Sequence, residues 1–504
     1  MAVENTTPNF LFTSDQLKTY TKLFYNFVIS NSIYLFIIPT ILSTTIHHFS
    51  AHGFNQTTIT QLHKCYANDP RSFIVGLVCL SLLLLGTIYV LTTIIRRPGK
   101  VYLVDFACYK HDPSFLASTE AVRQRLETVI SPESIAFCRK VMEKSGVSDN
   151  VFVYGLKDFP PKSTFDCARG EAETVIIGAV DDLLAKTGVN PRDIGMVIVN
   201  ISMFNPLPSL SAMIVNRYKL REDVISYNLG GMGCSAGVIA VDLAKRLLQG
   251  QRNTYALVMS LESPTSGYYV GGDRSKLLSN CLFRMGGAAL LLSNRSSDHH
   301  ISKYELKHTL RTHHGADDKG YTCVRQEVDE EGKLGMTISK DLIGVAGRAL
   351  KANIAALGPL VLPISEQLLF LVNNVVRKWF KIKGISPYVP DFKLAFNHFC
   401  IHTGGKAVLD EVEKNLNLTK WQMEPSRMTL YRYGNTSSSS VWYEFAYAEA
   451  KGRIQKGDCV WQIAFGSGFK CGSAVWHALR TIDPAKVDNP WSDVIHQFPI
   501  IVNN

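Results

Sequence analysis

The sequence predicts an α/β protein in which a layered sheet of strands and helices follows two N-terminal membrane-spanning helices. Two observations predict this architecture. Residues 101–504 alternate short apolar runs, typical of buried strands, with amphipathic segments, typical of helices that cover a sheet. Residues 1–100 instead hold two long stretches without a charged side chain, which is typical of a membrane anchor.

The composition is that of a large folded protein. Of 504 residues, 46% are hydrophobic and 19% are charged, which excludes the disordered, collagen-like and disulfide-scaffold classes. The net charge of +10, from 53 basic and 43 acidic side chains, is a mild excess without a dominant basic tract, so we expect no nucleic-acid partner. The 11 cysteines lack framework spacing and indicate a reduced, intracellular chain over most of its length.

Residues 24–46 and 73–95 are the two candidate membrane spans. Each exceeds the roughly 20 apolar residues that an α-helix needs to cross a bilayer, and neither contains a charged side chain. A cleaved signal peptide is the alternative for the first stretch, but its apolar part starts late and no small-residue cleavage site ends it. We therefore expect residues 1–100 to be a retained two-helix anchor.

Basic residues flank both spans and predict the orientation of the anchor. Two lysines precede the first span, and Arg96, Arg97 and Lys100 follow the second. The positive-inside rule then places both ends of the anchor, and the part of the chain that follows, in the cytosol. The loop between the spans is lumenal in this topology, and its Asn55 begins an acceptor sequon for glycosylation.

From residue 101 onward, strand and helix patterns interleave. The first half predicts strands at 196–201, 224–227, 255–261 and 288–292, with helices near 209–218 and 235–248. The second half predicts strands at 304–310, 392–396 and 459–465, with helices near 345–356, 406–416 and 438–451. We assign residues 101–300 and 301–504 to two domains, which an internal duplication would relate.

Residues 362–383 stand out within the second half. A dense apolar run ends in Arg377, Lys378, Lys381 and Lys383, and two asparagines interrupt it, so it is unsuited to cross a bilayer. Aromatic residues beside the lysines favour a helix that lies in the headgroup region. An ordinary helix of a core or of a subunit interface is the alternative.

A glycine-rich turn after the strand at 224–227 admits several chemistries. Gly231, Gly233 and Ala236 imitate a dinucleotide-binding loop, although such a pattern alone is weak. Gly233, Ser235 and Gly237 imitate the nucleophile elbow of serine hydrolases, which also joins a strand to a helix. Both interpretations stay open on the residues alone.

The third interpretation centres on Cys234 in the same turn. A thiol at a helix N-terminus meets unpaired N–H groups and the positive end of the helix dipole, which favour thiolate and can hold an oxyanion. A buried structural cysteine in a tight turn is the alternative. If Cys234 is a nucleophile, it needs a base from elsewhere in the chain.

Three later tracts supply candidate partners. His398, Cys400 and His402 suggest a metal site, but the two glycines that follow make a helical pair of ligands unfavourable, so we expect none. His402 and Asn435 lie in tracts that join a strand or loop to a helix. Gly466, Ser467 and Gly468 form a turn between two apolar strands, which is either a plain hairpin or a backbone wall beside a substrate.

Together these tracts resemble the plant 3-ketoacyl-CoA synthases of fatty acid elongation, which are thiolase-like condensing enzymes. With the two spans, the resemblance covers nearly the whole chain and rests on the following ordered motifs: GGMGCSAG (230–237), RTHHGADDK (311–319), NHFCIHTGGKAV (397–408), RYGNTSSSSVWYE (432–444) and FGSGFKC (465–471). The resemblance implies a thiolase-like five-layer αβαβα fold built from two duplicated halves.

The resemblance also implies a catalytic triad of Cys234, His402 and Asn435, with supporting roles for His313 and His398. Asparagine at the third position is typical of decarboxylating condensation with CoA thioesters. The implied reaction joins malonyl-CoA to a long-chain or very-long-chain acyl-CoA and yields 3-oxoacyl-CoA, CO2 and CoA. The turn at 466–468 would help to hold an oxyanion, and no metal or redox cofactor is expected.

The implied setting is the endoplasmic reticulum membrane. There a multi-pass homodimer is expected to work with the other elongase components, a ketoreductase, a dehydratase and an enoyl reductase. Three alternatives remain: a soluble-type polyketide synthase, a serine hydrolase using Ser235, and a non-catalytic scaffold. Two departures from the family pattern are Tyr431, where many members have histidine, and Gly472, where most have asparagine.

Overall fold

The computed structural model describes residues 99–155, 165–378, 386 and 388–500, together with Ser81 and Gly86. The predicted spans, apart from Ser81 and Gly86, and the sequon at Asn55 lie outside the described residues. Within the described ranges, no helix combines the length and the apolar composition that a bilayer crossing needs. The chain divides into two compact units, Met1–Pro98 and Gly99–Asn504, and the site described below belongs to the second.

The second unit is built around a nine-stranded mixed sheet. Its strand order is β11-β12-β13-β8-β1-β7-β6-β4-β5. The strands are β1 (Tyr102–Cys108), β4 (Ile194–Ile201), β5 (Ile225–Gly230), β6 (Tyr255–Glu262), β7 (Gly286–Ser293), β8 (Tyr304–His313), β11 (His398–Ile401), β12 (Cys459–Gly466) and β13 (Lys470–Ala478). Two small hairpin-like sheets pair β2 (Leu116–Ser118) with β3 (Asn150–Phe152) and β9 (Val324–Val328) with β10 (Leu334–Ile338).

The strand pattern of the large sheet repeats. Strands β1, β7, β6 and β4 pair antiparallel, antiparallel and parallel in that order. Strands β8, β13, β12 and β11 pair in the same three ways. β1 and β8 join the two halves by a short antiparallel pairing. The two halves therefore share one topology, to which the first half adds β5.

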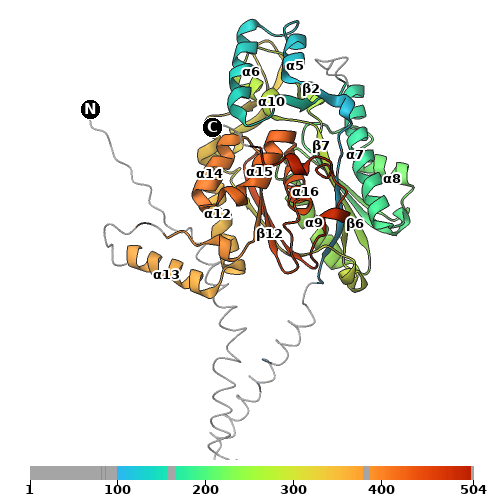
Figure 1. Ribbon diagram of the computed structural model, residues 1–504, viewed down its shortest axis with the longest axis vertical. Helices are drawn as coiled ribbons and strands as arrows, with labels where there is room; N and C mark the ends of the chain where they lie inside the picture. Colours follow the sequence, from blue (N-terminus) through green and yellow to red (C-terminus); the bar gives the residue numbers. More distant parts are fainter. Residues whose placement is uncertain are drawn as a thin grey trace, which may run out of the picture. The chain divides into compact units, whose positions relative to one another are not determined.

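Helices lie on the outer faces and between the halves. The outer helices α7 (Phe165–Thr187) and α8 (Leu210–Tyr218) cover one half, and α12 (Leu342–Val361) and α14 (Lys406–Leu416) cover the other (Figure 1). Between the halves lie α9 (Ala236–Gly250) and α16 (Ser440–Ala450), whose buried residues share one core with strands of both halves. All residues of α16 are buried, as expected for a middle layer. The remaining helices are α5 (Thr119–Leu126), α6 (Pro132–Ser145), α10 (Arg274–Leu282), α11 (Asp318–Thr322), α13 (Ile364–Lys378) and α15 (Lys420–Tyr433).

One predicted strand is wrong. Residues 392–396 form no strand: Phe392–Leu394 is a 3-10 turn, capped by the Asp391 carboxylate, which accepts the Lys393 N–H at 3.0 Å. Phe392 and Phe396 are apolar because they pack on Trp461 in the core. The strand that carries the histidine motif begins later, at His398.

Candidate active site

Cys234 lies between strand β5 and helix α9. The turn is tight because Gly231 and Gly233 adopt positive φ angles of 64° and 70°, which glycine takes without steric cost. Ser235 is the N-cap residue of α9, so Cys234 lies at the positive end of this helix. The residue as a whole is half-buried, and burial of its thiol dominates its pKa.

The turn at residues 466–468 packs directly on the Cys234 turn. A methyl group added to Gly233 would collide with the backbone N of Ser467, and one added to Gly466 would collide with the Ser235 hydroxyl. Glycine is required at both positions because the two backbones approach so closely. The structure thus places Gly466 and Ser467 beside the nucleophile turn, and their part in holding an oxyanion stays a prediction.

Asn435 approaches Cys234 from the second half of the chain. Its Oδ1 accepts the N–H of Ser437 at 2.8 Å, which leaves its amide NH2 as the donor. The side chains of Asn435 and Ser437 lie near the Cys234 sulfur, and both favour a lower pKa of this thiol. Ser437 holds a positive φ of 55°, which costs a non-glycine residue free energy and is typical of functional sites.

The backbone of Asn435 is fixed by the end of α10. Its N–H donates to the Leu282 carbonyl at 2.9 Å, and its carbonyl accepts the Arg284 N–H at 2.9 Å. These two bonds form a short parallel bridge between Phe283 and Asn435. The backbone of Asn435 is therefore held on both sides before any substrate binds.

His402 directly follows strand β11. Because β11 and β12 are parallel, their carboxyl ends lie at the same edge of the sheet, next to Gly466. The His402 N–H donates to the Ile463 carbonyl at 2.9 Å, and the Thr403 hydroxyl donates to the Gly434 carbonyl at 3.0 Å. Thr403 thus ties the histidine segment to the asparagine segment.

Burial controls the protonation of both candidate catalytic groups. It lowers the pKa of His402 to about 4, and within the described residues its Nδ1 has no hydrogen-bond partner. Burial raises the pKa of Cys234 to about 12, although the Ser437 hydrogen bond opposes the shift; the nearby Glu262 charge adds to it. At neutral pH the site therefore holds a thiol and a neutral imidazole, whereas the helix N-terminus alone favours thiolate.

Glu262 is a site residue that the sequence analysis missed. Its buried carboxylate accepts the Met203 N–H at 3.0 Å and lies near the Ser437 side chain, and burial raises its pKa. It is the last residue of β6, which runs parallel to β4. A charged residue directly after the apolar run at 255–261 was the signal that could have found it.

Of the two supporting histidines, His398 lies at the far end of its strand from His402, whereas His313 lies near the turn at 466–468. His398 is buried at the opposite end of β11, about 13 Å from His402 along the strand, and its Nε2 is 2.8 Å from Asp458 Oδ2. His313 ends β8, faces Lys470 across the ladder, and accepts the Gly315 N–H at 3.0 Å. Burial, with the nearby Lys470, lowers the pKa of His313. Any role of His398 must therefore act through the strand.

The geometry does not support a serine nucleophile at Ser235. The Ser235 hydroxyl is fully buried beside Gly466 and has no hydrogen-bond partner among the described residues, so it does not face a substrate. In the same part of the chain, no group of three or more histidine, cysteine or acidic side chains is placed to hold a metal.

Comparisons with known proteins agree on one family. The family described as FAE1/type III polyketide synthase-like protein matches residues 93–379, and the C-terminal domain of 3-oxoacyl-[acyl-carrier-protein] synthase III matches residues 395–478. The 3-ketoacyl-CoA synthases 2 and 11 of Arabidopsis thaliana are both 56% identical to the chain; they cover 98% and 96% of it, and the matches cover 93% and 94% of those proteins. The chain belongs to the 3-ketoacyl-CoA synthase family. The resemblance and the enzyme class expected from the sequence, an acyl-transferring condensing enzyme, are confirmed.

Solved structures show the fold. A fungal type III polyketide synthase aligns with a TM-score of 0.56 and 18% identity, over 75% of this chain and 99% of that chain. A 1,3,6,8-tetrahydroxynaphthalene synthase from Streptomyces coelicolor A3(2) aligns with a TM-score of 0.58 and 17% identity, also over 75% and 99%. The predicted thiolase-like α/β fold is confirmed.

The two departures from the family pattern occupy different surroundings. The ring of Tyr431 packs edge-on against Phe498, with centroids 6.5 Å apart, and makes no contact with the triad that the structure records. At Gly472 an added Cβ would lie 3.0 Å from Val238, one helical turn after Cys234 on α9. A side chain at position 472 would therefore press on the helix of the nucleophile.

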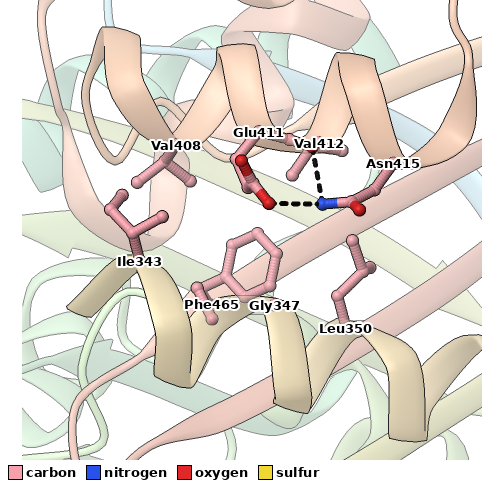
Figure 2. A pocket seen from close by; sticks show the side chains of 9 residues that line it. Ile343, Gly347, Leu350, Val408, Glu411, Val412, Asn415 and Phe465 are labelled. Atoms are coloured by element: carbon pink, nitrogen blue, oxygen red, sulfur yellow. Dashed lines mark hydrogen bonds between the residues drawn. The ribbon is translucent and has the colours of Figure 1, made fainter. Parts of the chain in front are cut away.

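A shallow pocket lies apart from this site. It has an empty volume of about 220 Å³ between α12 and α14 and is lined mainly by aliphatic side chains and by Phe465 (Figure 2). The Asn415 amide donates to the Glu411 carbonyl and carboxylate across its polar side, as Figure 2 shows. None of the triad residues lines the pocket, although Phe465 directly precedes Gly466.

Proposed function

We propose that the chain condenses malonyl-CoA with a long-chain or very-long-chain acyl-CoA by decarboxylation, the first step of fatty acid elongation. One observation carries this proposal: a half-buried cysteine at a helix N-terminus lies near Asn435, and Thr403 links the buried His402 to the same loop. Relatives 56% identical over nearly the full length are named 3-ketoacyl-CoA synthases.

The first half-reaction forms an acyl-enzyme. The thiol of Cys234 attacks the acyl-CoA carbonyl while neutral His402 takes the thiol proton. This transfer breaks the thioester bond between the acyl group and CoA. It forms a thioester bond between the acyl group and Cys234. CoA leaves as the thiol after its sulfur takes the proton held by His402. The burial that raises the pKa of Cys234 also excludes water from the thioester intermediate.

The second half-reaction generates the carbon nucleophile. Malonyl-CoA loses CO2, and the electron pair of the broken C–C bond moves into an enolate whose oxygen accepts hydrogen bonds from His402 and from the Asn435 amide. The hydrogen bond from Ser437 N–H to Asn435 Oδ1 points the amide NH2 at this oxygen. The carbanion then attacks the acyl carbonyl on Cys234, and the bond between this carbon and the Cys234 sulfur breaks. The 3-oxoacyl-CoA product is two carbons longer than the starter, and the Cys234 thiolate takes up a proton from solvent.

Backbone N–H groups would hold the oxyanion of this second attack. The Cys234 turn and the turn at 466–468 bring two backbones into contact at the reacting carbonyl. The loss of CO2 drives the condensation, so the proposed reaction uses no metal and no redox cofactor.

The proposed setting is a membrane. The sequence of residues 24–46 and 73–95 supports a two-helix anchor, and an acyl chain of this length partitions into a bilayer. We place the protein in the endoplasmic reticulum membrane with its catalytic part in the cytosol, as a homodimer. The 3-oxoacyl product requires reduction, dehydration and a second reduction, so a ketoreductase, a dehydratase and an enoyl reductase would act next.

The test is product analysis with malonyl-CoA labelled in its free carboxyl carbon. We expect one labelled CO2 for each 3-oxoacyl-CoA that is two carbons longer than the starter. Products that contain several malonyl units on an aromatic starter would instead indicate a polyketide synthase. Release of free fatty acid without condensation would indicate a hydrolase.

A further inference from the structure

Helix α13 presents an apolar face to the outside of the protein. Ile364, Leu368, Leu371 and Val372 follow the i, i+4, i+7, i+8 spacing of one helical face and are 68, 54, 56 and 57% exposed. Leu369 and Phe370, which flank the opposite side of the helix, are 52 and 41% exposed. An exposed run of large aliphatic side chains on one helix marks an interaction surface.

The polar face of the same helix points inward. Glu366 is only 6% exposed, and its carboxylate accepts the Tyr388 hydroxyl at 2.7 Å and the Asp391 N–H at 2.9 Å. Asn373 lies two turns further along the same face, accepts the Tyr388 N–H at 3.0 Å, and donates to the Ser386 carbonyl at 3.2 Å. The helix is therefore held by its polar side, and the usual orientation of an amphipathic helix is inverted.

The charge at the end of α13 indicates what covers the apolar face. Its first turn holds Glu366, the one acidic residue of the helix, which is already paired; its last turn holds Arg377. The sequence continues with Lys378, Trp379, Phe380, Lys381 and Lys383. Aliphatic side chains next to a basic and aromatic end suit an anionic lipid surface. A second copy of this face would offer no unpaired carboxylate to these cations.

We propose that α13 lies in the surface of a lipid bilayer, with the face formed by Ile364, Leu368, Leu371 and Val372 inserted among the acyl chains. The helix has 15 residues and is about 22 Å long, too short to cross a bilayer. This surface is a second membrane contact, separate in sequence from the proposed anchor in residues 1–100, and it gives the catalytic unit a fixed orientation toward the bilayer that dissolves its acyl substrate.

Photo-crosslinking in full-length protein tests the contact without relying on activity. A photoreactive p-benzoylphenylalanine replaces Leu371 in protein reconstituted into phosphatidylcholine and phosphatidylserine vesicles. The matched control carries the probe at Leu207, which is 91% exposed in the segment before α8. We expect roughly fivefold more lipid adduct at position 371 than at position 207. Equal adduct at both positions, or a crosslink between two copies of the chain at position 371, would overturn the proposal.

A pair of charge variants provides the second measurement. L371E should lower the rate several-fold when the acyl-CoA is presented in vesicles and leave the rate in detergent micelles unchanged, whereas L207E should alter neither rate. An equal loss in vesicles and micelles would contradict a lipid contact. Failure of the condensation itself would abolish activity in all variants but leave the crosslinking result intact, so the two hypotheses are distinguishable.

Discussion

The two halves of the second unit share one strand order but differ at the outer edge of the sheet. This difference determines which candidate catalytic residue each half supplies. In the first half, β5 adds a fifth strand beside β4, and its end leads through two glycines into α9. In the second half, α15 leads to α16 through the buried segment that holds Asn435 and Ser437, and no strand pairs with β11 on that side in the part of the chain that the structure describes. The first half supplies the thiol of Cys234, and the second half supplies the side-chain amide of Asn435.

The proposed active site requires the contact between the two halves. Cys234 comes from the first half, whereas His402, Asn435 and the turn at 466–468 come from the second. Gly237 of α9 packs against the Ser438 carbonyl, and Gly233 packs against Ser467. Neither half alone contains the proposed nucleophile together with its proposed base.

The largest expected effect is the loss of the nucleophile from the first half. Cys234→Ala should lower the condensation rate at least about a thousandfold, because no acyl-enzyme forms. The rate of 3-oxoacyl-CoA formation measures the effect. Cys459→Ala is the control, since Cys459 lies at the opposite end of β12 from Gly466, and it should retain the wild-type rate. A Cys234→Ala protein that condenses at the control rate would refute the assignment.

Removal of the amide from the second half should act on decarboxylation. Asn435→Ala should lower kcat about 10²- to 10³-fold with a smaller change in KM, because the donor acts on the enolate oxygen. Release of CO2 from malonyl-CoA and acylation of Cys234 are measured separately. We expect acylation to persist while CO2 release falls. Equal loss of both steps would indicate that Asn435 only supports the fold.

A glycine pair tests the close approach of the halves. Gly231 and Gly233 both have positive φ, but an added methyl group meets nothing within 4 Å at Gly231 and collides with Ser467 at Gly233. Gly231→Ala should cost about 1 kcal/mol of stability from backbone strain alone. Gly233→Ala should cost a further ~1–3 kcal/mol and most of the activity. Equal Tm values for the two variants would argue against the contact.

The charge of Glu262 should influence the thiol across the site. Its carboxylate raises the pKa of Cys234, so Glu262→Gln should shift the pH profile of Cys234 alkylation to lower pH. Iodoacetamide labelling, followed by peptide mass spectrometry, measures this shift. An unchanged profile, or a shift to higher pH, would show that the two groups do not interact.

A smaller effect is expected in the pH dependence of stability. The pKa of His402 is about 4 in the folded protein and near 6.5 in the unfolded chain, so the unfolded state binds more protons between these values. The free energy of unfolding therefore falls as the pH drops from 6.5 toward 4. At pH 5, protonation of His402 in the unfolded chain lowers the free energy of unfolding by about 2 kcal/mol, and this decrease should be absent in His402→Gln. The decrease in Tm from pH 7 to pH 5 should be smaller in His402→Gln than in wild type, and His300→Gln, at an exposed site, should behave as wild type.

The sequence predicted those elements whose period agrees with their burial. The predicted helix at 406–416 matches α14, and the predicted strand at 255–261 matches β6 to within one residue. The strand at 392–396 failed because Phe392 and Phe396 are apolar for core packing rather than for a strand face. The spacing of apolar residues indicates which side chains are buried. Tertiary contacts decide whether those side chains belong to a strand, a helix or a turn.

The residues of the proposed site could be named from the sequence, whereas their electrostatics could not. The ordered motifs named Cys234, His402 and Asn435, and the structure brings their segments together. The Cys234 thiol stays neutral because it is buried and because Glu262 is near. The elements that bury these groups are distant in sequence. No local pattern contains that information, because the groups that set these pKa values come from both halves.

The central claim is that Cys234 carries the acyl chain between the two half-reactions. The direct test incubates the full-length protein with saturated acyl-CoAs of about sixteen to twenty-six carbons, without malonyl-CoA, and maps the adduct by peptide mass spectrometry. The account predicts an acyl thioester on Cys234 that Cys234→Ala abolishes. An adduct on Ser235, or none on any residue at any chain length while condensation proceeds, would contradict it.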